Sequence, residues 1–253
     1  MRVRVYQRRF PMILGIIVSL FFIAQSGWCE TKAIVVASTS WTGAIAQAAG
    51  ADEVIILAPF EIKHPAEYDY RPADLAKLQS ASLIVYGGYE PFIKKMVVAA
   101  DYPETQVVKV KTTNVPDNLI RQARLLAEKL GTQKQELKWE KQFKKVYTGI
   151  QQRARLKKVT KIRVLVQEHQ QELVKWLGYD IVGCFGATEL SPAKVMELAK
   201  LKPDLIIDNI HNPQGKPIQQ IAECRYLELI SFPSVKTPTL NALFEENARI
   251  LGL

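Results

Sequence analysis

Short apolar runs alternate with amphipathic segments in the first half of the chain. Four runs rich in β-branched residues predict strands. They lie at 33–38, 53–58, 82–86 and 107–110. Amphipathic segments between them predict helices at 41–49, 72–80 and 91–99. Strands that alternate with helices in this way predict a parallel sheet with crossover connections.

The alternation stops after residue 110 and gives way to two consecutive helical patterns. Residues 116–130 predict a helix that ends at Gly131, a residue suited to helix termination. Residues 132–157 predict a second, longer helix, because their apolar positions recur at three- and four-residue steps. Thr132 and Gln135 have the spacing of a capping box at its start.

Strand–helix alternation resumes after residue 158. Strands are predicted at 161–167, 180–184, 204–208 and 227–232. Helices are predicted at 170–177, 191–201, 218–224 and 239–251. The pattern therefore predicts an α/β protein of two lobes, residues 31–131 and 158–253, joined by one long helix at 132–157.

The first 26 residues have the order of a secretory signal peptide. Four arginines and no acid precede the apolar run Met12–Ala24, which is short for a membrane span. The small residues Ala24 and Ser26 predict cleavage after Ser26, with a retained anchor as the alternative. Cys29 offers a lipid anchor as a further alternative, which the bulky Trp28 disfavours. The N-terminus thus predicts a periplasmic or otherwise extracytoplasmic protein.

Export would lower the net charge of the mature chain and would place its cysteines in an oxidising compartment. Loss of residues 1–26 removes four arginines and no acid, so the net charge falls from +9 to +5. No basic stripe with interleaved aromatics is present, which argues against nucleic acid binding, and the basic face of residues 132–157 is typical of a solvated helix. In an oxidising compartment Cys184 and Cys224 either form a disulfide or remain buried thiols; the sequence leaves both open.

All three histidines follow predicted strands. His64 follows the strand at 53–58, His169 the strand at 161–167, and His211 the strand at 204–208. One such histidine alone is more typical of a polar surface. Ligands of open α/β sheets bind beyond the carboxyl ends of the strands. Two lobes facing each other therefore predict a cleft that all three histidines line.

Carboxylates accompany the histidines. Glu67 lies near His64, Glu168 precedes His169, and Asp208 lies shortly before His211. Imidazoles with a carboxylate are typical ligands of zinc or manganese. The short motifs of zinc hydrolases, of serine hydrolases and of phosphate-binding glycine loops are absent. The pattern favours a metal-binding protein over an enzyme, with an exported metallohydrolase as a minor alternative.

Four longer segments carry a resemblance to a known family. They are VVASTSWTGAIAQAAG, ADLAKLQSASLIVYGGYEPFIKK, LVQEHQQELVKWLGYDIVG and LSPAKVMELAKLKPDLIIDN. Together with the export signal they make the chain resemble the metal-binding solute-binding proteins of zinc and manganese ABC transporters. The resemblance implies two lobes with parallel sheets, one long rigid helix and a metal in the cleft between the lobes. It also implies a monomer that delivers Zn²⁺ or Mn²⁺ to a membrane permease.

The chain departs from this family in its first loop. The family typically has Pro-His-Glu-Tyr-Glu-Pro there, whereas residues 65–70 read PAEYDY. Ala66 thus occupies the ligand position, and His64 lies two residues earlier. We expect His64 and Glu67 to supply the ligands of the first lobe.

The second lobe supplies the other expected ligands. His169 matches the family's third ligand position, and Asp208 matches its terminal carboxylate, with Asn209 as an equally close alternative. The family's second histidine would precede TTNVPDN, which contains none, so His211 is expected to replace it.

A second interpretation keeps the architecture and changes the ligand. Helix-linked binding proteins for cobalamin or an iron chelate also have LKPDLII-like segments. A bulky chelate would contact Trp41, Tyr68, Tyr70, Tyr89 and Arg71, although these side chains are also typical of partial burial at lobe edges.

Overall fold

The computed structural model describes residues 32–60, 62 and 65–253. Residues 33–253 form one compact unit. The predicted signal peptide (1–26), Cys29 and His64 lie outside the described residues. Within the described part of the chain, no helix has the length and apolar character needed to cross a bilayer.

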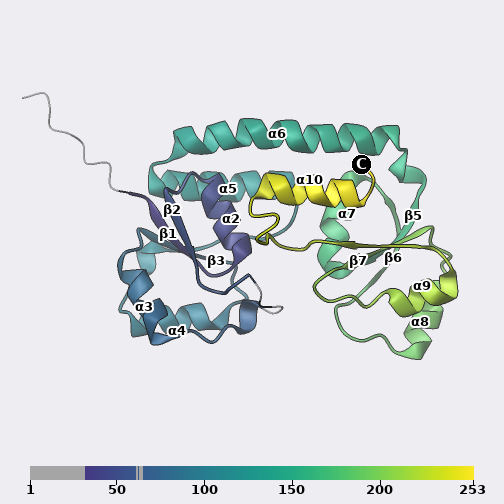
Figure 1. Ribbon diagram of the computed structural model, residues 1–253, viewed down its shortest axis with the longest axis horizontal. Coiled ribbons are helices and arrows are strands. Elements are labelled where there is room, and N and C mark those ends of the chain that lie inside the picture. Colours follow the sequence, from purple (N-terminus) through teal and green to yellow (C-terminus); the bar gives the residue numbers. More distant parts are fainter. Residues whose placement is uncertain (1–31, 61, 63–64) are drawn as a thin grey trace, which may run out of the picture. The chain divides into compact units, whose positions relative to one another are not determined.

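The first sheet contains four parallel strands in the order β2-β1-β3-β4 (Figure 1). The strands are β1 (Ile34–Ala37), β2 (Glu53–Ile56), β3 (Leu83–Tyr86) and β4 (Val107–Lys109). The connecting helices are α2 (Ser40–Ala48), α3 (Pro72–Gln79) and α4 (Pro91–Ala99), and Pro65–Glu67 and Glu104–Gln106 form short 3-10 turns. Helices cover both faces of β1, whose residues Val35 and Val36 are fully buried, as apolar strands of parallel sheets usually are.

The second sheet repeats this topology in the order β6-β5-β7-β8. Its strands are β5 (Arg163–Gln167), β6 (Asp180–Phe185), β7 (Leu205–Asn209) and β8 (Arg225–Leu229). Its helices are α7 (Gln171–Leu177), α8 (Pro192–Ala199), α9 (Lys216–Ala222) and α10 (Leu240–Ile250), with 3-10 turns at Val159–Lys161 and Glu168–Gln170. The predicted fold class, two α/β lobes with parallel sheets, is confirmed.

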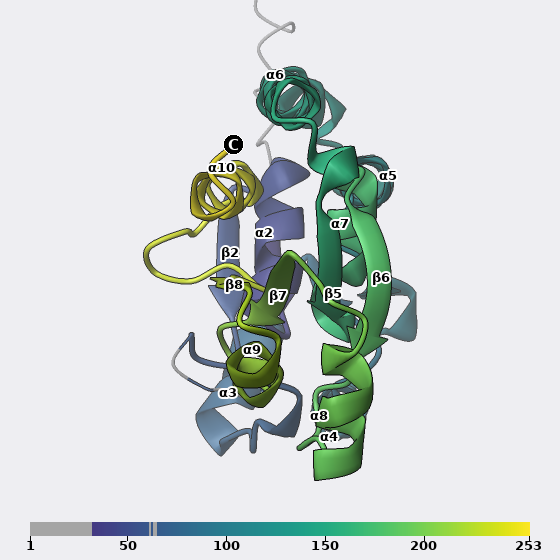
Figure 2. The same ribbon diagram turned by 90° about the vertical axis from the view of Figure 1, so that its right-hand side faces the viewer.

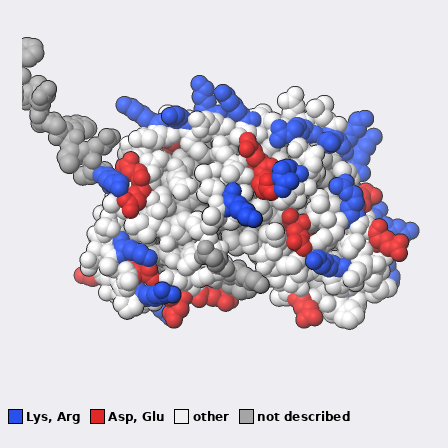
Figure 3. Space-filling model, viewed as in Figure 1, with Lys and Arg blue, Asp and Glu red and all other residues white. Residues whose placement is uncertain are grey.

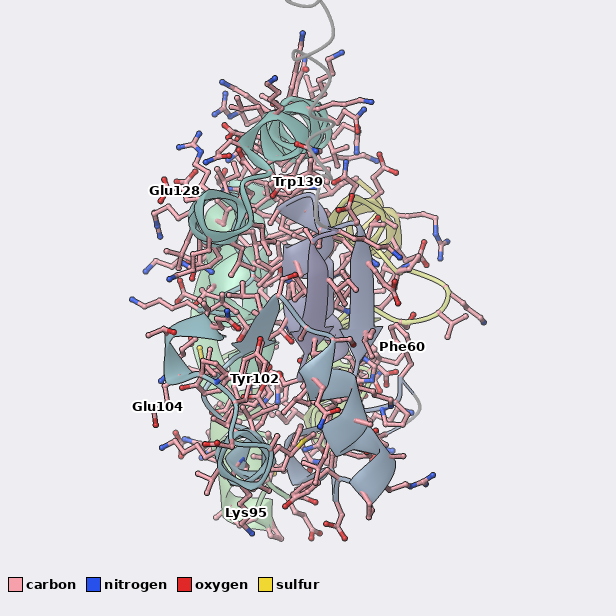
Figure 4. The ribbon with its side chains drawn as sticks, turned by 90° about the vertical axis from the view of Figure 1, so that its left-hand side faces the viewer. Phe60, Lys95, Tyr102, Glu104, Glu128 and Trp139 are labelled. Atoms are coloured by element: carbon pink, nitrogen blue, oxygen red, sulfur yellow. The ribbon has the colours of Figure 1, made fainter. Side chains whose placement is uncertain are left out.

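Two helices lead from the first sheet to the second. These are α5 (Pro116–Leu130) and α6 (Gln133–Leu156). α6 lies on one side of the strands, with α10 beside it, whereas α8 and α9 lie at the opposite end (Figure 2). The indole of Trp139 on α6 donates a hydrogen bond of 3.1 Å to Asn241 on α10 (Figure 4).

One continuous hydrophobic core contains residues of both sheets. It contains Val35 of β1 and Val164 of β5, together with Phe143 of α6 and Phe244 of α10. Separate clusters cover the far face of each sheet, under α3 and α4 in the first and under α8 and α9 in the second. The division into lobes at residues 131 and 158 stays a prediction, because the main core crosses it.

Two local predictions are wrong. Thr132 forms no capping box, because its hydroxyl donates to the carbonyl oxygen of Ala49 at 2.6 Å. The last strand ends at Leu229 instead of residue 232. Asn247 of α10 hydrogen-bonds both backbone groups of Ile230, at 2.8 and 2.9 Å, and so removes this residue from the sheet.

Candidate metal site

A cavity of about 620 Å³ lies beyond the carboxyl ends of strands from both sheets. The first sheet contributes the loops after β1, β3 and β4, together with the 3-10 turn at Pro65–Glu67. The second contributes the loops after β5, β7 and β8, and the first turn of α7. This is the place where open parallel sheets bind ligands.

His169 reaches the cavity from the 3-10 turn that follows β5. The backbone N–H of His169 donates a hydrogen bond of 2.8 Å to the buried side chain of Gln167, and this bond orients the turn. Three residues later Glu172, in the first turn of α7, lines the same cavity. The sequence analysis missed Glu172, although a spacing of three residues in a helical segment places two side chains on one face.

His211 lines the cavity from the loop after β7. Its ring lies parallel to that of Phe232, and its backbone N–H donates to the side chain of Asn209 at 3.1 Å. Burial lowers the pKa of His211, which favours the neutral imidazole that binds metals. Its buried Nε2 has no hydrogen-bond partner among the described residues, so it is available to a ligand.

Asp208 and Asn209 have different surroundings although they are neighbours on β7. Successive side chains of a strand point to opposite faces. Asn209 lines the cavity. The carboxylate of Asp208, fully buried outside the cavity lining, accepts hydrogen bonds from the backbone N–H groups of Asn209, Gln214 and Gly215 and from the Tyr226 hydroxyl.

These bonds give Asp208 a structural role. Burial and the hydrogen bond to Asp208 raise the pKa of Tyr226, so this hydroxyl stays a donor. With its oxygens occupied by four donors, Asp208 is not positioned as a cavity ligand. Asn209 is the better placed of the two alternatives.

The first sheet offers fewer charged donors. Glu67 lines the cavity from the 3-10 turn at Pro65–Glu67. His64, the other predicted ligand of this loop, lies outside the described residues. Glu168 is turned aside, because its carboxylate accepts the backbone N–H of Ala187 at 3.0 Å.

A buried carboxylate organises the loop after β3. Glu90 accepts the backbone N–H groups of Gly87, Gly88 and Tyr89 at 2.8–3.1 Å and the hydroxyl of Ser38 at 2.5 Å. Gly88 has φ +95°, a conformation that glycine adopts without strain. The loop places the Tyr89 side chain in the cavity wall, where burial and the charge of Glu90 raise the pKa of Tyr89.

Neutral polar groups complete the wall on the side of the first sheet. Thr112, Thr113 and Asn114, from the loop after β4, all line the cavity. Asn114 is only 7 % exposed, and neither its amide nitrogen nor its amide oxygen has a hydrogen-bond partner among the described residues. A buried amide without partners is unfavourable unless a ligand or water satisfies it. Asn114 is therefore a candidate ligand contact that the sequence analysis missed.

The donors share one cavity without converging on a single point. They are His169, His211, Glu67, Glu172, Asn209 and Asn114. Within residues 32–60, 62 and 65–253, no three His, Cys, Asp or Glu side chains lie close enough together to hold an ion.

Only two of the residues expected to contact a bulky chelate line the cavity. Trp41 and Tyr89 line the cavity. Tyr68 and Tyr70 pack against the cluster under α3 and α4, and Arg71 precedes the first residue of α3.

The cysteines of the described chain take no part in the site. Cys184 and Cys224 are both free, with Cys184 exposed. Burial of their sulfur atoms raises the pKa of both thiols. The structure shows neither the disulfide nor two buried thiols, because Cys184 is exposed and Cys224 is half-buried.

Comparison with known proteins agrees with this architecture. Residues 35–138 match the family model of ZnuA, described as zinc-uptake complex component A, periplasmic. A search of curated proteins by sequence finds no significant match. The match to the ZnuA family model thus covers the first sheet, α5 and the beginning of α6.

Solved structures share the fold over most of the chain. The Mn-bound periplasmic metal-binding protein of Candidatus Liberibacter asiaticus has 18% identity and a TM-score of 0.64, over 87% of this chain and 98% of that chain. The SBP FpvC of Pseudomonas aeruginosa in complex with Mn²⁺ has 18% identity and a TM-score of 0.66, over 85% and 94%. The predicted resemblance to the metal-binding solute-binding proteins is therefore confirmed for the fold, and over residues 35–138 also for the sequence.

Proposed function

We propose that the chain is an extracytoplasmic solute-binding protein that captures a divalent transition metal, zinc or manganese, and delivers it to the permease of an ABC transporter. One observation carries the proposal: His169 and His211, from two loops of the second sheet, line the same cavity as Glu67 from the first. Two imidazoles and a carboxylate suit both metals. The work of such a site is binding and release, without bond-making.

Rearrangement of the cavity forms part of this proposal. Glu67 belongs to a loop of the first sheet and His169 and His211 to loops of the second, so an ion bound by all three would bridge the two sheets. An ion held between the sheets draws these loops together. Separation of the same loops on docking to the permease removes ligands and releases the ion.

Melting of the metal-free protein tests the proposal. A ligand that binds only the native state raises the melting temperature. Zn²⁺ or Mn²⁺ is expected to do so, and His169→Ala, His211→Ala and Glu67→Gln are each expected to reduce the shift. Glu189→Gln, an exposed carboxylate outside the cavity lining, is the matched control. Absence of a shift with both metals overturns the proposal.

A metal chelate is the second candidate ligand. The cavity volume of about 620 Å³ lies within the range of small-molecule pockets, about 300–1,000 Å³. Aromatic and amide side chains, Trp41 and Asn114 among them, suit an organic ligand shell. Addition of an iron chelate or cobalamin in the same melting experiment separates the candidates, because the chelate interpretation predicts a shift with the complex and none with the bare ion.

A further inference from the structure

The outer face of α6 carries nine of the 30 Lys and Arg residues of the segment 32–253. Its basic residues, with the two that follow the helix, are called here the α6 basic face. They are Lys134, Lys138, Lys141, Lys144, Lys145, Arg153, Arg155, Lys157 and Lys158. All nine are exposed, and Figure 3 shows Lys and Arg side chains gathered along the upper edge of the molecule, where α6 lies in Figure 1.

No acidic residue neutralises this face. Glu136 is buried, and Glu140 bonds to Arg124 of α5 at 2.7–2.9 Å. Within the described chain, none of the nine basic residues takes part in a salt bridge. Residues 32–132 and 159–253 together have 21 Lys or Arg and 22 Asp or Glu, so the chain outside α6 and the two residues after it is almost neutral.

Four of the lysines form one continuous stripe. Lys134, Lys138, Lys141 and Lys145 follow one another at steps of four, three and four residues, which places them on one side of a helix. The buried residues Phe143 and Ile150 occupy the opposite side. Like charges at this spacing destabilise a helix.

Exposed leucines lie among these cations. Leu137 is 59 % exposed and Leu156 is 75 % exposed, one near each end of α6. Basic residues interspersed with apolar side chains are typical of helices that lie on an anionic membrane surface.

The beginning of the compact unit lies beside the first turn of α6. The N–H of Ala33 donates to Asp52 at 2.8 Å. Two residues before Asp52, Gly50 approaches α6 so closely that a Cβ there would lie 2.4 Å from the Cβ of Gln135. The described fold therefore begins near one end of the α6 basic face.

We propose that the α6 basic face binds the anionic headgroups of a phospholipid bilayer. Lysines and arginines contact lipid phosphates, and Leu137 and Leu156 enter the headgroup layer. No residue of α6 lines the cavity, so this contact leaves the cavity open to ligand. The proposal concerns a different surface from the metal site and stands independently of the metal.

Sedimentation with vesicles tests the proposal. The metal-free chain from residue 27, which contains the whole described unit and its three hydrophobic clusters, is mixed with vesicles of phosphatidylcholine, with and without phosphatidylglycerol. Binding is expected only to the anionic vesicles and is expected to fall as salt is added. Each basic residue at an anionic surface changes partitioning about fivefold, so K134Q/K138Q/K141Q/K145Q is expected to reduce it by about 600-fold.

A variant with the same charge change elsewhere provides the control. K94Q/K95Q/K200Q/K236Q removes four exposed lysines outside α6 and is expected to bind anionic vesicles nearly as well as the parent. Circular dichroism checks that both variants are folded. Equal binding to both kinds of vesicle, no binding to either, or equal loss in the two variants overturns the proposal.

Discussion

The imidazole of His211 stacks on the ring of Phe232, with centroids 3.8 Å apart and 15° between the ring planes. His211 follows β7 and Phe232 follows β8, so the contact joins two loops of the cavity wall. It also shields the imidazole from water. The rigid, neutral imidazole that results is suited to metal binding.

Replacement of Phe232 by alanine should weaken metal binding. The stack orients His211, and loss of a group that orients a metal ligand typically reduces affinity by about 10- to 100-fold. Titration of Zn²⁺ or Mn²⁺ by calorimetry measures the change. In a His211→Ala background the same replacement should have little further effect, and an equally large loss there would contradict a role through His211.

The stability of the metal-free chain should depend on the protonation of His211. Burial holds the pKa of His211 below 6.5, the ordinary value that applies to the unfolded chain. The unfolded state therefore binds this proton more readily than the folded state. The contribution of the neutral imidazole is fully present above pH 6.5 and is lost as the pH falls through the lowered folded value. Urea denaturation from pH 7.5 to 5 should show that His211→Asn loses less stability on acidification than the parent; equal slopes would contradict this.

Asp208→Ala should destabilise the protein whether or not metal is present. The substitution leaves the backbone N–H groups of Asn209, Gln214 and Gly215 without their buried acceptor, whereas the Tyr226 hydroxyl keeps Glu228 as an acceptor. Buried donors left unsatisfied cost about 1–3 kcal/mol each, so we expect a loss of at least about 3 kcal/mol in the free energy of unfolding. Urea denaturation without metal measures it, and Asp180→Ala, an exposed carboxylate, is the control. Normal stability with lost metal binding would instead make Asp208 a ligand.

Asp208 also shows where the sequence is informative and where it is not. The alternation of strands and helices predicted the fold, because apolar patterns reflect burial directly. The position of His169 and His211 at strand ends followed from the same pattern. The choice between Asp208 and Asn209 depends on which face of β7 meets the cavity. It also depends on the hydrogen-bond donors outside β7 that surround Asp208, and the sequence pattern shows neither.

Asn114 was unpredictable for a different reason. Neutral amides occur throughout loops, and only tertiary packing buries this one without partners in a cavity wall. Glu172 is the contrary case, because its spacing from His169 is visible in the sequence. The last strand was predicted too long, since the side chain that ends it, Asn247, is distant in sequence.

Substitution of Asn114 should separate a bare ion from an anionic chelate. Asn114→Ala removes a polar group that we expect to contact the ligand, so it should weaken binding of either. Asn114→Asp adds a negative charge to the cavity and should tighten binding of a divalent cation, because opposite charges attract, while weakening that of an anionic chelate. Calorimetric titration measures both, with Gln142→Glu, an exposed position on α6, as the control for charge. Unchanged affinity in both variants would exclude contact between Asn114 and the ligand.

Phe143→Ala should lower the stability of both sheets together. Phe143 is fully buried in α6, with ring centroids 5.0 Å from Trp139 and 5.1 Å from Phe244, and it belongs to the core that passes through both sheets. Truncation of a buried phenylalanine costs about 3–5 kcal/mol. Urea denaturation followed by the fluorescence of Trp41, near the first sheet, and of Trp176, near the second, should give one shared transition at lower urea. Val98→Ala, at a side chain that is 79 % exposed, is the control. Separate transitions, with only one of them shifted, would mean that the two lobes unfold independently and that α6 acts as a linker between two domains.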